Sequence, residues 1–352
     1  MSPDPAFWRG RRVLLTGHTG FKGAWLALIL SRLGAAVTGI ALDPPGGPAL
    51  FPVLAPGCRL DDRRHDITVP GLLAAVMAAA RPSIVLHLAA QALVPAGYAD
   101  PAGTFATNVT GTIHLLEALR GQRGIAAALI VTTDKVYRNS GNGRRFCEDD
   151  PLGGTDPYSA SKAAAELAVA AWRASHGNDL PRIATARAGN VIGGGDFAAG
   201  RLVPDLVRAW TAATPLLVRY PNATRPWQHV LDVLRGYLLQ AEHLAIHPAA
   251  PPALNFAPPG SGSLSVRAMI EAFGAAAGRQ LPWQPVAALA EASSLSLDAT
   301  LAERTLGWRP RLNQAEAIAA VTGWYASWHR GEDMLRRSVA DIEEAAVAPA
   351  YA

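Results

Sequence analysis

Short apolar runs alternate with longer segments of helical apolar spacing over the first half of the chain. We predict β-strands for the short runs, which are residues 13–15, 37–42, 84–88, 127–132 and 183–186. We predict α-helices for the longer segments, which are residues 19–34, 70–80, 103–120 and 157–175. Regular alternation of strands and helices favours an α/β fold of the Rossmann type, in which helices cover both faces of a doubly wound parallel sheet.

The texture of the sequence changes near residue 190, where glycine and proline become frequent and the predicted helices become shorter. This change predicts a main domain over residues 1–188 and a smaller C-terminal, substrate-binding domain over residues 189–340. A segment near 227–257 is expected to return to the main sheet. The last dozen residues, 341–352, are expected to form a frayed tail.

The composition excludes several classes of protein. Half of the 352 residues are hydrophobic and 17% are charged, so the chain is long and apolar enough to bury a large core. The net charge of +4 comes from scattered basic residues, which argues against a nucleic-acid partner. No apolar run approaches the roughly 18 residues that cross a membrane. Cys58 and Cys147 have neither metal-ligand nor disulfide-framework spacing, so the cytoplasm is the expected compartment.

Lysine is rare among the basic residues. Of the 32 lysines and arginines, only Lys22, Lys135 and Lys162 are lysine. An arginine keeps its proton in a protein, whereas a lysine can lose it. These three positions are therefore candidates for chemistry that needs an amine, with chance placement as the alternative.

A glycine-rich turn links the first predicted strand to the first predicted helix. Gly17, Gly20 and Gly23 follow the spacing GxxGxxG, which allows a tight turn, close approach of the backbone to a phosphate, and close packing of helix on strand. We interpret this loop as a dinucleotide-binding site, with a purely structural glycine turn as the alternative. The other loop residues expected at the cofactor are Thr19, Phe21 and Lys22.

Further cofactor contacts are expected where later segments end. Asp43 follows the strand 37–42 with no arginine directly after it, so a ribose hydroxyl is its expected partner and NAD is favoured over NADP. Asp66 and Ile67 are expected near the adenine. The residues after 84–88 that would let the cofactor pass close to the backbone are Ala89, Ala90 and Gln91.

Tyr158 and Lys162 are four residues apart on a predicted helix and therefore share one face. An ammonium group beside a phenol favours the phenolate, so we expect Lys162 to lower the pKa of Tyr158. Such a phenolate can take a proton from a hydroxyl while hydride leaves the same carbon. An ordinary amphipathic helix is the alternative interpretation.

Thr133, Asp134 and Lys135 follow the predicted strand 127–132. In doubly wound sheets, substrates bind beyond the carboxyl ends of the strands. Thr133 can bind a sugar hydroxyl, while Asp134 and Lys135 form an adjacent acid and base. This pair indicates a second chemical step, an elimination, with a helix cap or surface pair as the alternative.

Histidine and tryptophan pairs carry weaker signals. His243 and His247 share a helical face but lack a third ligand, so we expect a surface pair and predict no metal site. Trp324 and Trp328 are expected in the core rather than in a base-stacking platform.

Several stretches match a known family: HTGFKG at 18–23, TNVTGT at 107–112, TTDKVY at 132–137, YSASK at 158–162 and RAGNVIGGGD at 187–196. On these motifs the chain resembles the extended short-chain dehydrogenase/reductase family over nearly its whole length, and within it the 4,6-dehydratases that act on CDP-glucose. The lysine of the TDK triplet is among the more specific parts, since dTDP-glucose dehydratases have glutamate there.

The resemblance implies an enzyme that uses NAD on a nucleotide sugar, with CDP-glucose favoured. The catalytic positions that it implies are Thr133, Asp134, Lys135, Tyr158 and Lys162. Asn108 is added to the cofactor contacts. The implied substrate contacts are Thr133, Asn190, Arg201, Arg225 and His229. Helices 103–120 and 157–175 are expected to join subunits into a homodimer or homotetramer.

The expected reaction is a 4,6-dehydration. Tyr158 takes the C4 hydroxyl proton as hydride passes to NAD, Lys135 removes the C5 proton, Asp134 protonates the departing C6 hydroxyl, and hydride returns to C6. The alternatives are a dTDP-, UDP- or GDP-sugar as substrate, a 4-epimerase, and a dinucleotide-binding sensor. The Asp134–Lys135 pair argues against the epimerase, and an intact Tyr158 and Lys162 argue against the sensor.

Overall fold

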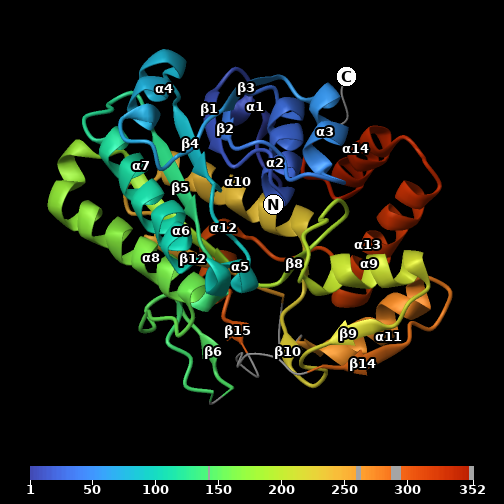
Figure 1. Cartoon of the computed structure of the whole chain (residues 1–352). Coiled ribbons are helices and arrows are strands. Elements are labelled where there is room, and N and C mark those ends of the chain that lie inside the picture. The colour runs from blue at the N-terminus through green and yellow to red at the C-terminus, as the bar shows by residue number, and fades with distance from the viewer. Residues whose placement is uncertain (142, 259–262, 287–294, 349–352) are drawn as a thin grey trace.

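The computed structural model describes residues 1–141, 143–258, 263–286 and 295–348. Within these ranges the main sheet has seven parallel strands in the order β12-β7-β5-β4-β1-β2-β3 (Figure 1). The strands are β1 (Arg12–Thr16), β2 (Ala36–Ala41), β3 (Leu60–Arg64), β4 (Ile84–His87), β5 (Ala127–Val131), β7 (Arg182–Ala188) and β12 (Ala253–Phe256). The strand order reverses between β1 and β4, which confirms the predicted doubly wound Rossmann-type sheet.

Apolar residues on both faces of the strands explain why helices cover the sheet on both sides. Val13 and Leu15 face one core with α2 (Phe21–Arg32) and α10 (Val230–Ile246). Leu14 faces a second core on the opposite side. The helices of that side are α4 (Leu72–Ala80), α7 (Gly111–Leu119) and α8 (Pro157–His176). Strands that are buried on both faces are typical of parallel sheets.

Helix α8 begins at a well-formed N-terminus. The side chain of Asp156 accepts a hydrogen bond from the Ser159 amide (3.0 Å), and Pro157 occupies the first turn, where no intrahelical partner for its nitrogen is needed. The first two turns of α8 carry Tyr158 and Lys162. Lys162 Nζ donates to the carbonyl of Val131, the last residue of β5, so this part of α8 lies at the end of that strand.

Shorter helices complete the N-terminal half. They are α1 (Pro5–Trp8), α3 (Leu50–Leu54), α5 (Val94–Ala99) and α6 (Pro101–Phe105). The described helices after α10 are α11 (Val266–Ala276), α12 (Thr300–Leu306), α13 (Gln314–His329) and α14 (Met334–Glu344), and α9 (Leu202–Ala212) precedes them. No helix in the described ranges is long and apolar enough to cross a membrane.

In the part of the chain that the structure describes, four small two-stranded sheets lie outside the main one (Figure 1). They pair β6 (Arg145–Phe146) with β15 (Ser296–Leu297), β8 (Val191–Ile192) with β11 (Gln228–His229), β9 (Leu216–Val218) with β14 (Trp283–Pro285), and β10 (Thr224–Arg225) with β13 (Leu264–Ser265). The chain returns to the main sheet at β12, which lies parallel to β7.

The expected frayed tail at 341–352 is wrong for its first part. Helix α14 continues to Glu344, and Ile342, Val347 and Ala348 are buried. These apolar side chains belong to the main core, against which α14 packs through α13 and α3. Residues 349–352 lie outside the described ranges.

Candidate active site

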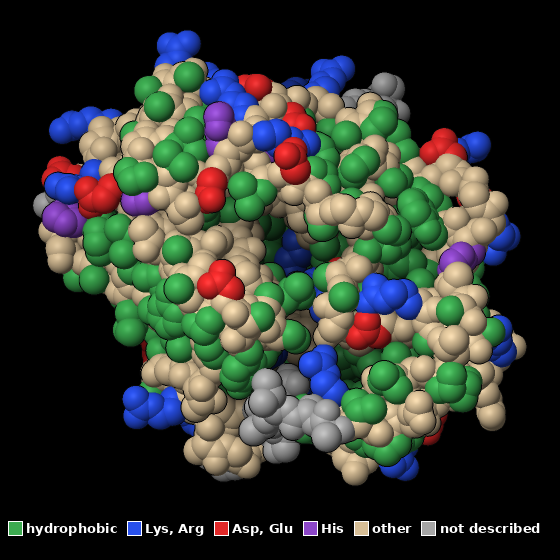
Figure 2. Space-filling model, viewed as in Figure 1, with side chains coloured by type: hydrophobic (Ala, Val, Ile, Leu, Met, Phe, Trp, Pro, Cys, Tyr) green, Lys and Arg blue, Asp and Glu red, His purple; other side chains and the backbone are tan. Residues whose placement is uncertain are grey.

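A cavity of about 950 Å³ opens beyond the carboxyl ends of the central strands, and Figure 2 shows a hollow in the surface with basic side chains at its depth. It lies where the strand order reverses, between the main sheet and the segments that carry α9, β9 and β10. This is the position at which doubly wound sheets bind their ligands. Among the predicted site residues, the cavity is lined by Gly17, Thr19, Gly20, Phe21, Lys22, Gly23, Asp66, Ile67, Ala89, Ala90, Gln91, Thr133, Asp134, Lys135, Tyr158, Lys162, Asn190, Arg201 and Arg225.

The glycine loop fits a dinucleotide by its geometry. Gly17 has a φ of +78°, and a Cβ there would lie 2.7 Å from the amide nitrogen of Ala89. A Cβ on Gly23 would lie 2.0 Å from the carbonyl oxygen of Gly17. Gly20 is the N-cap of α2 and forms no side-chain cap, and the first residues of the helix line the cavity. Uncapped amides at a helix N-terminus favour a phosphate group.

Two predicted cofactor residues do not line the cavity. The Asp43 side chain is 86% exposed, and Arg64 lies 3.8 Å from its carboxylate. Asn108 is buried behind the cavity wall, where its side chain accepts from the Gln91 amide (2.9 Å) and donates to the Gln91 carbonyl (3.0 Å). Asn108 therefore holds the backbone of a lining residue in place.

His18 and Asp62 form a contact that the sequence analysis did not identify. The His18 ring is buried, its Nε2 lies 2.8 Å from the Asp62 carboxylate, and a Cβ on Gly39 would strike it at 2.6 Å. Burial lowers the pKa of His18 despite the hydrogen bond with Asp62. His18 thus ties the glycine loop to β2 and β3.

Lys22 points into the cavity from the glycine loop. Its Nζ donates to the hydroxyl of Tyr237 on α10 (3.3 Å). Burial, with the nearby charges of Arg201 and Lys162, lowers the pKa of Lys22 to about 7. Lys22 is therefore a basic group inside the site that exchanges its proton near neutral pH.

Tyr158 is buried in the cavity wall and forms a hydrogen bond with Thr133. Its burial raises the pKa of Tyr158, whereas the Thr133 hydrogen bond and the charge of Lys135 act in the opposite direction. The prediction that Lys162 lowers the pKa of Tyr158 is wrong, because Lys162 is not among the groups that act on Tyr158. Lys162 instead donates to the carbonyl of Val131 (2.9 Å), and burial lowers the pKa of Lys162 to about 8.

Thr133, Asp134 and Lys135 form a compact cluster at the end of β5. Thr133 caps a short 3₁₀ turn, and its hydroxyl donates to Asp134 Oδ1 (2.9 Å). Lys135 Nζ lies 3.6 Å from the same oxygen. Asp134 Oδ2 is buried and has no hydrogen-bond partner among the described residues. The cluster thus presents an acid and an amine side by side in the cavity.

Three of the four predicted substrate residues beyond this cluster line the cavity. Arg201 pairs with Asp196 (2.9 Å), and Arg225 is buried. Asn190 has a φ of +30°, and its buried Oδ1 has no hydrogen-bond partner within the described chain. His229 does not line the cavity: its Nδ1 accepts from the Leu231 amide (3.4 Å), and burial lowers the pKa of His229 to about 4. His229 is an N-cap of α10.

A buried ion pair beneath α8 was missed by sequence reasoning. Arg187 on β7 binds Glu166, which lies one turn beyond Lys162 on the same helix. Arg187 also donates to the hydroxyl of Tyr137 (2.8 Å), just after Lys135 in the chain. The spacing of Tyr158, Lys162 and Glu166 in steps of four was the available signal.

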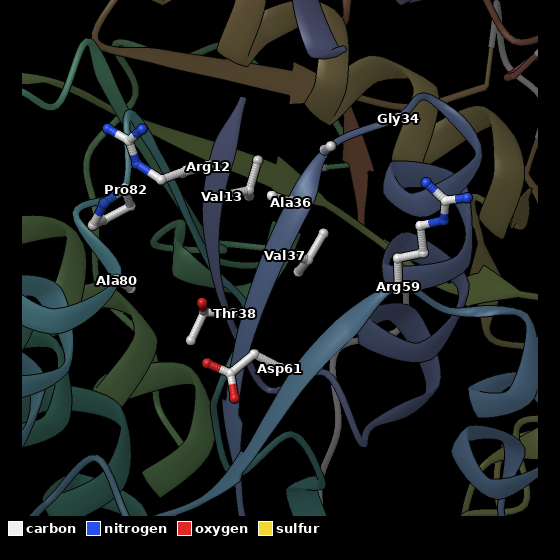
Figure 3. A pocket seen from close by; sticks show the side chains of 11 residues that line it. Arg12, Val13, Gly34, Ala36, Val37, Thr38, Arg59, Asp61, Ala80 and Pro82 are labelled. Atoms are coloured by element: carbon white, nitrogen blue, oxygen red, sulfur yellow. The ribbon is translucent and has the colours of Figure 1, made fainter. Parts of the chain in front are cut away.

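A second cavity of about 410 Å³ lies at the opposite, amino ends of β1 and β2 (Figure 3). Arg12, Arg59 and Asp61 are the charged residues that line it. None of the predicted site residues borders this cavity.

Fold and site together define a nucleotide-binding protein with a tyrosine, a lysine and an acid–amine pair at the switch point of its sheet. The chain belongs to the NAD dependent epimerase/dehydratase family, whose model matches residues 13–250.

Comparison with known proteins narrows the relationship. The chain is 39% identical to CDP-glucose 4,6-dehydratase of Salmonella typhimurium over 354 residues, which cover 97% of this chain and 98% of that protein. It is 31% identical to dTDP-glucose 4,6-dehydratase of Streptomyces griseus, covering 89% of this chain and 93% of that one. Among solved structures, a dTDP-glucose 4,6-dehydratase of Streptomyces venezuelae with NAD and TYD bound has a TM-score of 0.79 at 26% identity, covering 92% of this chain and 99% of the other.

Proposed function

We propose that the protein is an NAD-dependent 4,6-dehydratase of nucleotide sugars, and that it converts CDP-glucose to CDP-4-keto-6-deoxyglucose. The observation that carries the proposal is the meeting of Thr133, Asp134, Lys135 and Tyr158 in one cavity beside the glycine loop. The 39% identity to a CDP-glucose 4,6-dehydratase over nearly the full length supports the choice of CDP-glucose.

The cofactor site is formed by the glycine loop and the ends of β3 and β4. Gly17, Gly20 and Gly23 admit the pyrophosphate to the backbone, and Lys22 supplies a positive charge. NAD held there would supply a hydride acceptor for the oxidation at C4 and a hydride donor for the reduction at C6. Asn108 supports Gln91 from behind the cavity wall. Asp43 lies at the exposed ribose edge. The remaining contacts are Thr19, Phe21, Asp66, Ile67, Ala89, Ala90 and Gln91.

Tyr158 is the base that removes the C4 hydroxyl proton. Its hydrogen bond with Thr133 and the charge of Lys135 favour the phenolate, while burial opposes it. Thr133 also holds the sugar hydroxyl that Tyr158 deprotonates. Lys162 lies at the floor of the site, where its Nζ donates to the Val131 carbonyl.

Asp134 and Lys135 carry out the elimination. The C4 ketone acidifies the C5 proton, which the side-chain nitrogen of Lys135 removes. Asp134 is the acid that gives a proton to the departing C6 hydroxyl, so that water leaves. Lys135 returns a proton to C5 when the double bond is reduced. Both groups already lie 3.6 Å apart in the cavity, so no large movement is required.

The substrate diphosphate lies against the basic side of the cavity. Arg201 and Arg225 provide cations, and the unpartnered Oδ1 of Asn190 provides an acceptor for a sugar or ribose hydroxyl. We assign residues 1–188 to the cofactor-binding domain and 189–340 to the substrate-binding domain, with β12 returning to the main sheet. His229 supports this region from the N-terminus of α10.

A homodimer or homotetramer formed through α7 and α8 is part of the proposal. Leu167 on α8 is 58% exposed, and Phe105 on the adjacent α6 is 39% exposed. Large apolar side chains on neighbouring helices favour burial against a second copy. Light scattering of wild type and Leu167→Glu tests this, because a charge at the interface would dissociate the oligomer.

We place the protein in the cytoplasm, consistent with its two free cysteines.

The deciding experiment compares nucleotide sugars. Purified protein is incubated with NAD and with CDP-, dTDP-, UDP- or GDP-glucose, and products are identified by mass and by the alkaline absorbance of 4-keto-6-deoxy sugars. We expect loss of one water, fastest with CDP-glucose. Faster conversion of another nucleotide sugar would show that the enzyme prefers a different nucleobase from cytosine. An isomer of unchanged mass would indicate a 4-epimerase, and no conversion of any sugar would leave a dinucleotide sensor.

A further inference from the structure

Gly189 lies directly behind the acid of the proposed elimination. It follows β7, whose last residue is Ala188. A Cβ on Gly189 would lie 2.2 Å from Asp134 Oδ2, 2.7 Å from its Cγ and 3.2 Å from its Cβ. Three successive atoms of the side chain are too close, so rotation of the carboxylate alone would not relieve the contact. Asp134 occupies its place only because residue 189 has no side chain.

The backbone at Gly189 is held on its far side. Gln228 Nε2 donates to the Gly189 carbonyl (2.9 Å) and to the Phe256 carbonyl (2.8 Å). Asn190, the next residue, already has a φ of +30°, and its carbonyl accepts from the Gln228 amide (3.2 Å). Because this segment is pinned to β11 and β12, an added methyl group would displace the Asp134 side chain rather than the backbone.

The carboxylate of Asp134, which an added methyl group would displace, is the group that the proposed elimination needs. Asp134 Oδ1 is engaged by the Thr133 hydroxyl and by Lys135, whereas Oδ2 is buried and has no partner among the described residues. A buried carboxylate oxygen without a partner is costly, and a substrate hydroxyl in the cavity would supply the missing hydrogen bond. The position of Oδ2 is therefore set by Gly189 on one side and by the substrate on the other.

We propose that Gly189 is a positioning residue that sets the place of Asp134 for proton transfer to the leaving C6 hydroxyl. The inference rests on the proposed dehydration. The atoms nearest to a Cβ on Gly189 belong to Asp134 and not to Tyr158. We therefore expect the oxidation at C4 to depend less on Gly189 than the elimination does.

The test is Gly189→Ala, with CDP-glucose in single-turnover experiments. We expect the oxidation at C4, followed by the absorbance of the reduced nicotinamide, to continue, and the loss of water to slow by roughly 10- to 100-fold, as for displacements of about 1 Å in other active sites. Reduced nicotinamide then accumulates. NAD and CDP-glucose binding, measured by calorimetry, is expected to stay within about twofold of wild type. Equal slowing of both steps would overturn the proposal.

A double-mutant cycle makes the test independent of a general loss of fold. Asp134→Ala removes the atoms at 2.2 and 2.7 Å, so Gly189→Ala should lower Tm in the wild-type background and much less in the Asp134→Ala background. Equal losses of Tm in both backgrounds would overturn the proposal. So would a crystal structure of Gly189→Ala in which Asp134 keeps its place. These two outcomes do not depend on which sugar is converted.

Two glycines provide matched controls. A Cβ on Gly103 would lie 2.1 Å from Oδ2 of Asp100, an exposed carboxylate outside the cavity, while a Cβ on Gly177 would meet no described atom within 4 Å. Gly103→Ala is expected to lower Tm without accumulation of reduced nicotinamide, and Gly177→Ala to change neither. If wild type converts no CDP-glucose, the proposed function fails, and the Tm cycle still decides whether Gly189 positions Asp134.

Discussion

Arg187 binds both carboxylate oxygens of Glu166, with Nε 2.9 Å from Oε1 and Nη2 2.8 Å from Oε2. The same carboxylate accepts hydrogen bonds from Thr132, at the end of β5, and from Thr185. Arg187 reaches Tyr137 on its other side. One buried pair therefore joins α8, which carries Tyr158 and Lys162, to the segment on either side of the Thr133–Lys135 cluster.

Loss of one partner of this pair should destabilise the whole chain. Arg187→Met leaves the Glu166 carboxylate buried and uncompensated, which typically costs about 3–5 kcal/mol of unfolding free energy. Urea denaturation measures the change. Arg120→Met, at the exposed pair with Glu117, is the control and should have little effect. Equal effects of the two variants would show that the Arg187–Glu166 pair is not a major support.

Tyr158→Phe should stop the reaction at its first step. The variant lacks the oxygen that takes the C4 hydroxyl proton, and Phe preserves the packing of a residue that is only 8% exposed. We expect turnover to fall by at least roughly 100-fold, the lower range for loss of a general base. No reduced nicotinamide should form on mixing with CDP-glucose. Formation of reduced nicotinamide at the wild-type rate would show that Tyr158 is not the base.

Lys135→Arg should separate the two steps. Arginine keeps a positive charge near Tyr158, which supports the oxidation, but it cannot serve as the base at C5 because it does not lose its proton. Reduced nicotinamide should accumulate while the 4-keto-6-deoxy product is absent. Lys135→Met, which also lacks the charge, should slow the oxidation as well. Full product formation by Lys135→Arg would show that position 135 needs only a positive charge and does not act as the base at C5.

Binding of NAD should depend on pH through Lys22. Its pKa of about 7 in the folded chain is lowered from 10.5, so the amine is mostly uncharged above pH 8. A phosphate beside it favours the charged form, so NAD binding takes up a proton above about pH 7 and weakens as the pH rises. Calorimetric titration between pH 6 and 9 measures this slope. Lys22→Gln should bind more weakly at pH 6 and lose most of the slope; an unchanged slope would exclude Lys22 as its source.

Glu242 should make stability depend on pH. Burial raises its pKa from 4.5 to about 7, although Trp8 and the Asp4 amide donate to its carboxylate. The folded chain holds this proton more tightly than the unfolded chain, so the contribution is complete below pH 4.5 and is lost as pH rises through 7. At about 1.4 kcal/mol per pKa unit, wild type should lose about 2 kcal/mol of it between pH 5 and 8. Urea denaturation of Glu242→Gln should lack this component; an identical pH dependence in both proteins would contradict the assignment.

The sheet and the glycine loop were predictable because their signals are local. Apolar runs mark strands that are buried on both faces, and the glycine spacing marks a turn in which Gly23 lies against the backbone of Gly17, six residues earlier. Strand β3 escaped notice because its sequence, LDDRR, is polar. It lies at the edge of the sheet, where β2 is its neighbour among the described strands, and its side chains are exposed or half-buried.

Contacts between distant segments were not predictable. Lys22 meets Tyr237 from 215 positions away, and the Thr133–Asp134–Lys135 cluster meets Gly189 only once β5 and β7 pair. The pKa of Tyr158 depends on how deeply α8 seats in the fold, which the spacing of Tyr158 and Lys162 does not encode. His229 resembled a ligand contact by its motif, but its place as a helix cap depends on the local turn before α10.

Strand β12 has a consequence for how the chain is made. It supplies the outer partner of β7 from residues Ala253–Phe256, after α10 has covered the sheet. A nascent chain on the ribosome therefore exposes an unpaired β7 edge until about residue 256 has emerged, and unpaired edges invite association with other chains. The main sheet therefore cannot be completed until residues Ala253–Phe256 have been made.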